Sequence, residues 1–177
     1  FVSRGLGDVY KRQIYFIFQP AEEGGHGARA MIEDGLFDRF PCESVYGMHN
    51  MPGYEVGTFA VRKGPILAAA DAAYVTVLGT GGHGAFPHLA RDPVLTGARI
   101  VEAWNAVVAR RLSPLDSAVV SVTQFRASEA VNVIPDSVEI GATVRTLTAA
   151  ARQLLERELG TLAEQIASAH GMEAKYR

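Results

Sequence analysis

The chain has 177 residues, of which 48% are hydrophobic and 20% charged, a composition typical of a soluble globular protein with room for one large or two small domains. Its formal net charge is −2 and its basic residues are spread along the sequence, so nothing indicates nucleic acid or an anionic membrane as a partner. No apolar run approaches the roughly 18 residues that a membrane-spanning helix needs, and the single Cys42 excludes a disulfide within the chain. We therefore expect a cytoplasmic protein.

The two ends of the sequence do not look like natural ends. Residues 1–13 show no clear hydrophobic period and run directly into an apolar segment, so we interpret them as a non-native segment and leave them out of the fold prediction. The last residues, 172–177, have the pattern of a strand that breaks off. The chain is expected to be an internal fragment of a longer protein.

Residues 14–69 have the pattern of a strand, a helix and a second strand. Ile14–Phe18 is a short continuous apolar run, typical of a buried parallel strand, and Ser44–Met48 is another. Between them, Ala28–Glu33 contains good helix formers, and Gly35 is a suitable residue to end the helix. A βαβ unit needs helices on both faces of its sheet, so we expect this part to be the end of a larger α/β domain with a parallel sheet.

Residues 70–177 have the order strand, helix, strand, strand, helix, strand. The predicted strands are Ala72–Leu78, Val119–Phe125, Val138–Val144 and Met172–Tyr176. Each helix follows a residue that can cap it, Asp92 for the first and Thr148 for the second. This order is that of a ferredoxin-like β-α-β-β-α-β unit.

The strand at 138–144 also indicates where a polar side chain is available. Apolar and polar residues alternate along it, which predicts one core face and one polar face. Both helices of a ferredoxin-like unit lie on the same side of its sheet. Arg145, on the polar face, should therefore project from the open side.

Two adjacent glutamates, Glu22 and Glu23, follow the first apolar run where its strand would end. Ligands of open α/β sheets bind beyond the carboxyl ends of the strands, and His49 falls just past the next such end. One carboxylate could bind a metal ion while its neighbour holds a water, and the ion would offset their mutual repulsion. The alternative is a pair of solvated loop carboxylates beside a hydrogen-bonded histidine. The pattern leaves both open, because a catalytic zinc usually takes three protein ligands.

Residues 79–88, GTGGHGAFPH, contain the spacing G-x-G-x-x-G but do not fit a dinucleotide site. Such a site requires a helix to begin there, and Pro87 and Pro93 delay the helix. It also requires an acidic residue on a second strand, whereas Glu102 lies in the middle of the helix. What remains is His83 in a glycine-rich loop, either a surface residue or a catalytic one.

A connection of about a dozen residues, RASEAVNVIPDS, joins two predicted hairpin strands that would ordinarily need about two to five. Its apolar residues argue against disorder. Within it, Asn132 could offer its amide to an oxyanion or a carboxylate, or it could stabilise its own loop.

Several of these segments together resemble one family. They are FQPAEEGG…GARAMIEDGLF, YGMHNMPGYEVGTFAVRKGPILAAAD, GTGGHGAFPH, DPV, NVIPD and GATVRT, in that order between Ile14 and Arg177. The order is that of metal-dependent aminoacylase and hippurate hydrolase-type amidohydrolases, zinc metallopeptidase relatives with a peptidase dimerisation domain. The resemblance implies hydrolysis of the amide bond of N-acyl amino acids. It also implies that residues 14–69 belong to the catalytic domain and that 70–177 form a lid or dimerisation domain.

In the first of these domains, the resemblance implies three roles. Glu22 matches the general base that activates a metal-bound water, while Glu23 and His49 match metal ligands. The implied cofactors are divalent metal ions, zinc or manganese, two per complete site. The family's upstream Cys and His ligands and its C-terminal histidine ligand have no counterpart here, so we expect the fragment alone to be inactive and the parent enzyme to be active.

In the lid domain, His83 matches a histidine that reaches into the active site, in dimeric members that of the partner subunit, to stabilise the oxyanion. Asn132 and Arg145 match substrate contacts and are candidates for holding the substrate carboxylate, a task that suits the bidentate geometry of arginine. The implied partners are a small N-acyl amino acid and a second copy of the chain. Two alternatives stay open, namely a non-catalytic dimerisation module and a dipeptide exopeptidase of the same family.

Overall fold

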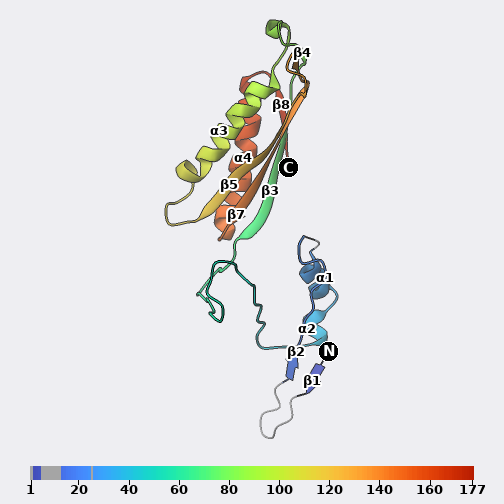
Figure 1. Ribbon diagram of the computed structural model, residues 1–177, viewed down its shortest axis with the longest axis vertical. Helices are drawn as coiled ribbons and strands as arrows, with labels where there is room; N and C mark the ends of the chain where they lie inside the picture. Colours follow the sequence, from blue (N-terminus) through green and yellow to red (C-terminus); the bar gives the residue numbers. More distant parts are fainter. Residues whose placement is uncertain (1, 5–12, 25) are drawn as a thin grey trace. The chain divides into compact units, whose positions relative to one another are not determined.

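The computed structural model describes residues 2–4, 13–24 and 26–177 and shows a mixed α/β protein (Figure 1). The chain forms two compact units, Phe1–Thr58 and Phe59–Arg177. In the described part of the chain, no helix combines the length and the apolar character needed to cross a membrane.

The first unit contains two short strands and two short helices. Strand β1 (Val2–Arg4) pairs antiparallel with β2 (Gln13–Tyr15), and helix α1 (Gly27–Glu33) is followed by α2 (Leu36–Arg39). Gly35 lies between the helices with a φ of 81°, a left-handed conformation that favours glycine and ends the predicted helix as expected. Of residues 1–13, interpreted from the sequence as non-native, 1 and 5–12 lie outside the described residues.

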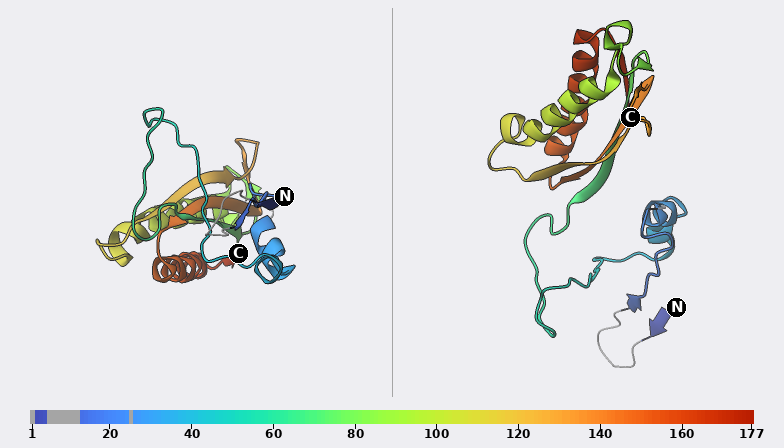
Figure 2. Two further views of the ribbon diagram at one scale, coloured as in Figure 1. Left: turned by 90° about the horizontal axis from the view of Figure 1, so that it is seen from below. Right: turned by 45° about the horizontal axis from the view of Figure 1, so that its top comes forward.

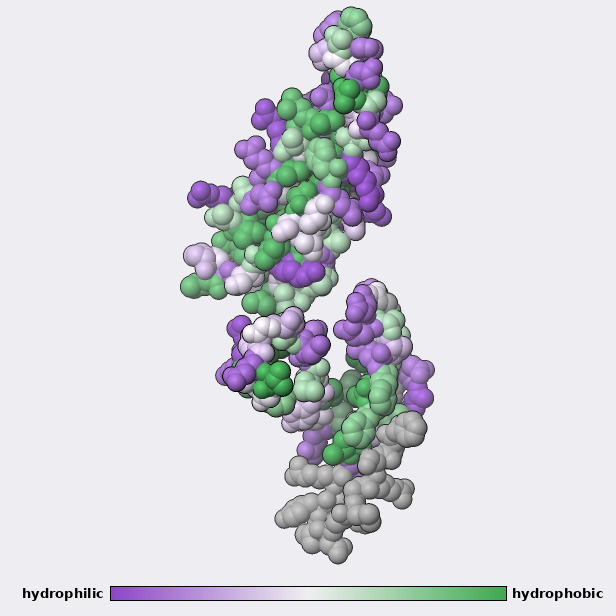
Figure 3. Space-filling view, viewed as in Figure 1, coloured by the Kyte–Doolittle hydropathy of each residue, from purple (hydrophilic) through white to green (hydrophobic). Residues whose placement is uncertain are grey.

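The predicted buried parallel strand at Ile14–Phe18 is wrong. Only the part within β2 is a strand, and its pairing is antiparallel. Most of its apolar side chains are exposed, and Phe18 is 77% accessible to solvent. Hydrophobic residues, drawn in green, lie on the surface of this unit in Figure 3. A buried parallel strand needs parallel neighbours and covering helices, and the described residues of this unit supply neither.

The second strand predicted in this part, Ser44–Met48, is also wrong. The segment has no regular secondary structure, and Tyr46 is 91% exposed. An apolar run becomes a strand only when a neighbouring strand satisfies its backbone N–H and C=O groups. The described residues of the first unit therefore contain no βαβ unit.

The second unit is a four-stranded antiparallel sheet with two helices on one face (Figure 2). Its strands have the spatial order β5-β7-β3-β8. The elements are β3 (Ala69–Leu78), α3 (Pro93–Arg111), β5 (Ala118–Arg126), β7 (Ser137–Thr146), α4 (Ala149–Ala169) and β8 (Glu173–Tyr176). The strands and helices predicted for this part of the sequence are all confirmed.

Both helices start at the predicted caps. The Asp92 carboxylate accepts the backbone N–H of Val94 at 2.8 Å, and the Thr148 hydroxyl accepts that of Ala151 at 3.2 Å. Each cap satisfies one of the N–H groups that a helix leaves without an internal partner.

The hydrophobic core lies between the helices and the sheet. Trp104 of α3 is fully buried, and its indole N–H donates to the carbonyl of Leu159 in α4 at 3.0 Å, which joins the two helices. The apolar residues of β7 face this core, as the alternating pattern predicts; they are Val138, Ile140, Ala142 and Val144. The alternate residues Glu139, Thr143 and Arg145 lie on the opposite face of the sheet.

Candidate functional site

Glu22 and Glu23 lie in a tight turn between β2 and α1. Ala21 has a φ of 48°, which is strained for a residue with a side chain, and such strain is most frequent at functional sites. The carbonyl oxygen of Pro20 packs so closely against Gly27 that a Cβ atom there would lie 1.6 Å from it, so only glycine fits. The turn leaves both carboxylates exposed, and among the described residues neither has a hydrogen-bond or ion-pair partner.

His49 lies in the irregular segment after α2, and its surroundings determine its tautomer. Its Nδ1 is 2.6 Å from the carbonyl oxygen of Asn50. Because a carbonyl only accepts, Nδ1 carries a proton and Nε2 of the neutral ring keeps a lone pair. A histidine that binds a metal ion commonly donates its other ring N–H to a carbonyl in this way.

The donors of the first unit fit a divalent metal ion as part of a ligand set. A carboxylate and a neutral imidazole are ligands of zinc and of other divalent metals. Within residues 2–4, 13–24 and 26–177, however, no group of three or more His, Cys, Asp or Glu side chains is placed to hold an ion. Glu23 and His49 would therefore supply part of a ligand shell and not a complete one.

In the second unit, the structure brings the His83 loop and the Asn132 loop together. Strand β4 (Gly82–His83) pairs antiparallel with β6 (Val133–Ile134), so that His83 lies opposite Val133. The backbone N–H of Gly84 donates to the carbonyl of Asn132 at 2.7 Å. The two candidates thus share one end of the sheet, which we call the tip, made of residues 79–89 and 128–136.

The backbone of the tip also determines the tautomer of His83. The N–H of Ala85 donates to His83 Nδ1 at 3.1 Å, so Nδ1 is an acceptor and the neutral ring carries its proton on Nε2. The ring lies 5.5 Å, centroid to centroid, from Phe86, which is itself 53% exposed. A neutral histidine in this tautomer has an N–H donor of the kind that stabilises an oxyanion.

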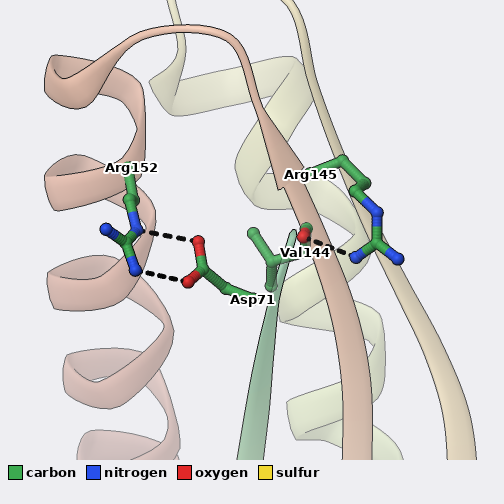
Figure 4. Close-up of polar contacts among 4 residues, drawn as sticks. All are labelled: Asp71, Val144, Arg145 and Arg152. Atoms are coloured by element: carbon green, nitrogen blue, oxygen red, sulfur yellow. Dashed lines mark hydrogen bonds and ion pairs between the residues drawn. The ribbon is translucent and has the colours of Figure 1, made fainter. Parts of the chain in front are cut away.

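Arg145 projects from the face of the sheet opposite the helices, as predicted (Figure 4). Its Nη1 donates to Thr143 Oγ1 at 2.6 Å and to the Val144 carbonyl at 3.0 Å. On the helix side, Arg152 of α4 binds both carboxylate oxygens of Asp71, at 2.8 and 2.5 Å. The hydrogen bond to Asp71 and its charge raise the pKa of Arg152 above its usual range.

Arg145 is far from the tip along the sheet. It pairs with Ala70 of β3, whereas Ser137, the first residue of β7, pairs with Leu78, which leads into the glycine loop. The strand from Ser137 to Arg145 spans roughly 26 Å at about 3.3 Å per residue. One chain therefore brings His83 and Asn132 together but does not bring Arg145 to them.

Asp136 also lies at the tip, although the sequence pattern assigned it no role. Its carboxylate accepts the N–H of Gly81 at 2.8 Å, and its own carbonyl accepts the N–H of Gly79 at 2.8 Å. An Asp after a Pro signals a turn that can bond backbone amides. The signal does not say which amides, because the two segments are far apart in the sequence.

Comparison with known proteins places the chain in a family. Residues 3–175 match the family described as peptidase family M20/M25/M40. The chain is 42% identical over 158 residues to the hippurate hydrolase of Campylobacter jejuni. This alignment covers 89% of this chain and 41% of that protein. It is also 39% identical over 167 residues to an N-acetylcysteine deacetylase of Bacillus subtilis, in an alignment that covers 94% of this chain and 43% of that protein.

Solved structures give the same result. A dinuclear metal-binding peptidase of the M20 family from Bacillus subtilis is 33% identical, with a TM-score of 0.68 over 90% of this chain and 38% of that one. A protein from methicillin-resistant Staphylococcus aureus is 36% identical, with a TM-score of 0.80 over 90% of this chain and 41% of that one. The chain spans about two fifths of the length of the curated relatives described above. It belongs to peptidase family M20/M25/M40.

Proposed function

We propose that the chain is part of a metal-dependent amidohydrolase that cleaves the amide bond of N-acyl amino acids. The observation that carries the proposal is the set of donors in the first unit: two exposed carboxylates in a strained turn, without a polar partner among the described residues, and a histidine whose tautomer leaves Nε2 available. The names of the relatives, a hippurate hydrolase and an N-acetylcysteine deacetylase, support N-acyl amino acids as the substrate class.

Residues 14–69 would belong to the catalytic domain and hold part of the metal site. Glu23 and His49 would be ligands of divalent ions, zinc or manganese, with two ions in a complete site. When bound, such ions activate water and polarise the amide carbonyl. Glu22 would accept the proton of the attacking water at a carboxylate oxygen and then deliver it to the leaving amine.

Residues 70–177 would form a ferredoxin-like lid and dimerisation domain. The strand order and the two helices on one face support this assignment, and the outer strand β5 leaves a row of backbone groups through which a second copy could pair. His83 would donate from Nε2 to the oxyanion, and Asn132 and Arg145 would contact the substrate carboxylate. Because the tip and Arg145 lie far apart in one chain, we infer that they serve two different active sites of a homodimer.

The experiment that tests this function compares Glu22→Gln with wild type in the complete enzyme. We expect turnover of hippurate and N-acetylcysteine to fall by about 10² to 10⁴, because glutamine cannot accept the proton. Metal content, measured by elemental analysis, should stay near that of wild type.

Glu23→Ala is the matched control, because it should lose metal as well as activity. Dipeptides in the same assay separate an exopeptidase from an N-acyl amino acid hydrolase. Turnover by Glu22→Gln at the wild-type rate would overturn the role of Glu22. A wild-type enzyme that hydrolyses no N-acyl amino acid would overturn the function itself.

A further inference from the structure

Asp136 holds the glycine loop of the tip by two separate bonds. It lies between β6 and β7, directly before the strand that runs through the centre of the sheet. Its backbone carbonyl accepts the N–H of Gly79, and its side-chain Oδ1 accepts the N–H of Gly81, each at 2.8 Å. The side-chain bond therefore acts two residues before His83.

The contact at Gly81 is too close for any other residue. A Cβ atom there would lie 2.7 Å from the carbonyl oxygen of Ile134 and 2.9 Å from Asp136 Oδ1. The loop is thus seated directly on the segment from Ile134 to Asp136. On the other side of His83, the bond from Gly84 to the Asn132 carbonyl holds the loop a second time.

The anchor adds to the other contacts of the loop, which are the pairing of β4 with β6 and the backbone bonds between Thr80 and Arg91. Glycine-rich backbone has more conformational freedom than any other, and His83 and Gly84 are exposed, whereas Gly81 is partly buried. A donor that stabilises an oxyanion has to be held within about 0.5 Å of its productive position. The bond between Asp136 and Gly81 is exposed to solvent and joins two segments of the tip that lie 55 residues apart in the sequence.

We propose that Asp136 is a positioning residue for His83: by holding Gly81, its carboxylate sets the place from which the His83 Nε2–H is presented to the reacting group. The catalytic consequence rests on the proposed function, whereas the anchoring of the loop does not. The conservative change to asparagine keeps an oxygen acceptor at the same place, and the change to alanine removes it.

The first test measures amide hydrogen exchange by NMR in the 177-residue chain, for wild type and for the variants Asp136→Ala and Asp136→Asn. In Asp136→Ala we expect the Gly81 N–H to exchange about tenfold faster or more, since it loses its acceptor. The Gly79 N–H should keep its rate, because its acceptor is the backbone of residue 136. Asp136→Asn should preserve both rates, and Glu129→Ala, which removes a carboxylate from the same connection, is the control.

The second test is steady-state kinetics of the same variants in the complete enzyme. A displaced oxyanion donor lowers kcat and kcat/KM together, so we expect Asp136→Ala to lose about tenfold in both with KM almost unchanged. Asp136→Asn should recover most of the loss, and Glu129→Ala should match wild type. Because a loss of folded enzyme would also lower the apparent kcat at constant KM, kcat is calculated per folded enzyme, with the folded fraction of each variant measured by urea unfolding.

Three results would overturn the inference: unchanged Gly81 exchange in Asp136→Ala, unchanged kcat in that variant despite faster exchange, or an equal loss of kcat in Asp136→Asn. If the wild-type enzyme hydrolyses no N-acyl amino acid, the proposed function fails. The exchange rates of Gly81 and Gly79 would then still decide whether Asp136 anchors the loop.

Discussion

At Tyr176 of β8, several charged groups of the second unit come close to an aromatic side chain. The ring makes an edge contact with Trp104 at 6.2 Å between centroids, so it forms part of the core. Burial raises the pKa of the Tyr176 hydroxyl, and the nearby carboxylates of Glu156 and Asp71 raise it further. The folded protein therefore holds this proton more tightly than the unfolded chain does.

The raised pKa predicts how stability depends on alkaline pH. Below the ordinary tyrosine pKa of about 10 the contribution of Tyr176 is fully present, and it is lost as the pH rises above that value towards the folded pKa. The free energy of unfolding in urea should fall as the pH is raised from 9 to 11, and Tyr176→Phe should show a shallower fall. Tyr46→Phe, at a residue that is 91% exposed, is the control. A Tyr176→Phe slope equal to that of wild type would contradict the prediction.

Most of the candidate side chains could be selected from the sequence, but the tautomers of the histidines among them could not be predicted from it. Glu22 and His83 stand in short segments with a recognisable composition, so residue type and spacing were enough to select them. The tautomers of His49 and His83 depend on the carbonyl of Asn50 and the N–H of Ala85, whose positions only the folded backbone defines.

Among the elements, α3 shows how a local pattern sets a helix boundary. Asp92 accepts the N–H of Val94, and Pro93 occupies the first helical position, where its missing N–H is no loss. These interactions are within three residues of one another. They therefore depend on neighbours along the chain and not on a partner strand.

The cap of α3 gives a prediction about stability. Asp92→Ala should lower the free energy of unfolding by about 1 kcal/mol, because the Val94 N–H loses its acceptor. Asp92→Asn keeps a good capping residue and should lose less. Urea denaturation of the two variants beside wild type measures both values. Equal losses in the two variants would show that the charge of Asp92, and not its capping hydrogen bond, is responsible.

At the scale of the whole molecule, the two units differ in how much they bury. The second unit contains the apolar core around Trp104, while among the described residues of the first unit only Gly27 is buried. The proposed metal ligands Glu23 and His49 both belong to the first unit. They lie in a turn and an irregular segment, and the described residues of their own unit form no packed core around them.

This difference predicts weak metal binding by the isolated chain. Calorimetric titration with zinc or manganese should show no tight, saturable binding, because two protein ligands on exposed backbone are too few for a zinc site. Glu23→Ala is the control and should behave like wild type. Tight binding at a fixed stoichiometry that Glu23→Ala abolishes would contradict the prediction and would show that the described residues supply a more complete site.

Features that depend on neighbours along the chain could be predicted from the residues alone: the caps of α3 and α4, the glycine end of α1, the alternating faces of β7 and the order of elements in residues 70–177. Features that depend on distant segments could not, because no local pattern specifies which segments meet. Ile14–Phe18 and Val119–Phe125 are both rich in apolar residues, yet the first pairs only at Ile14 and Tyr15, with the short strand β1, whereas the second pairs along β7, since a strand is completed by its neighbours. The same holds for the pairing of β4 with β6, which places His83 opposite Val133, next to Asn132, and leaves Arg145 at the other end of the sheet.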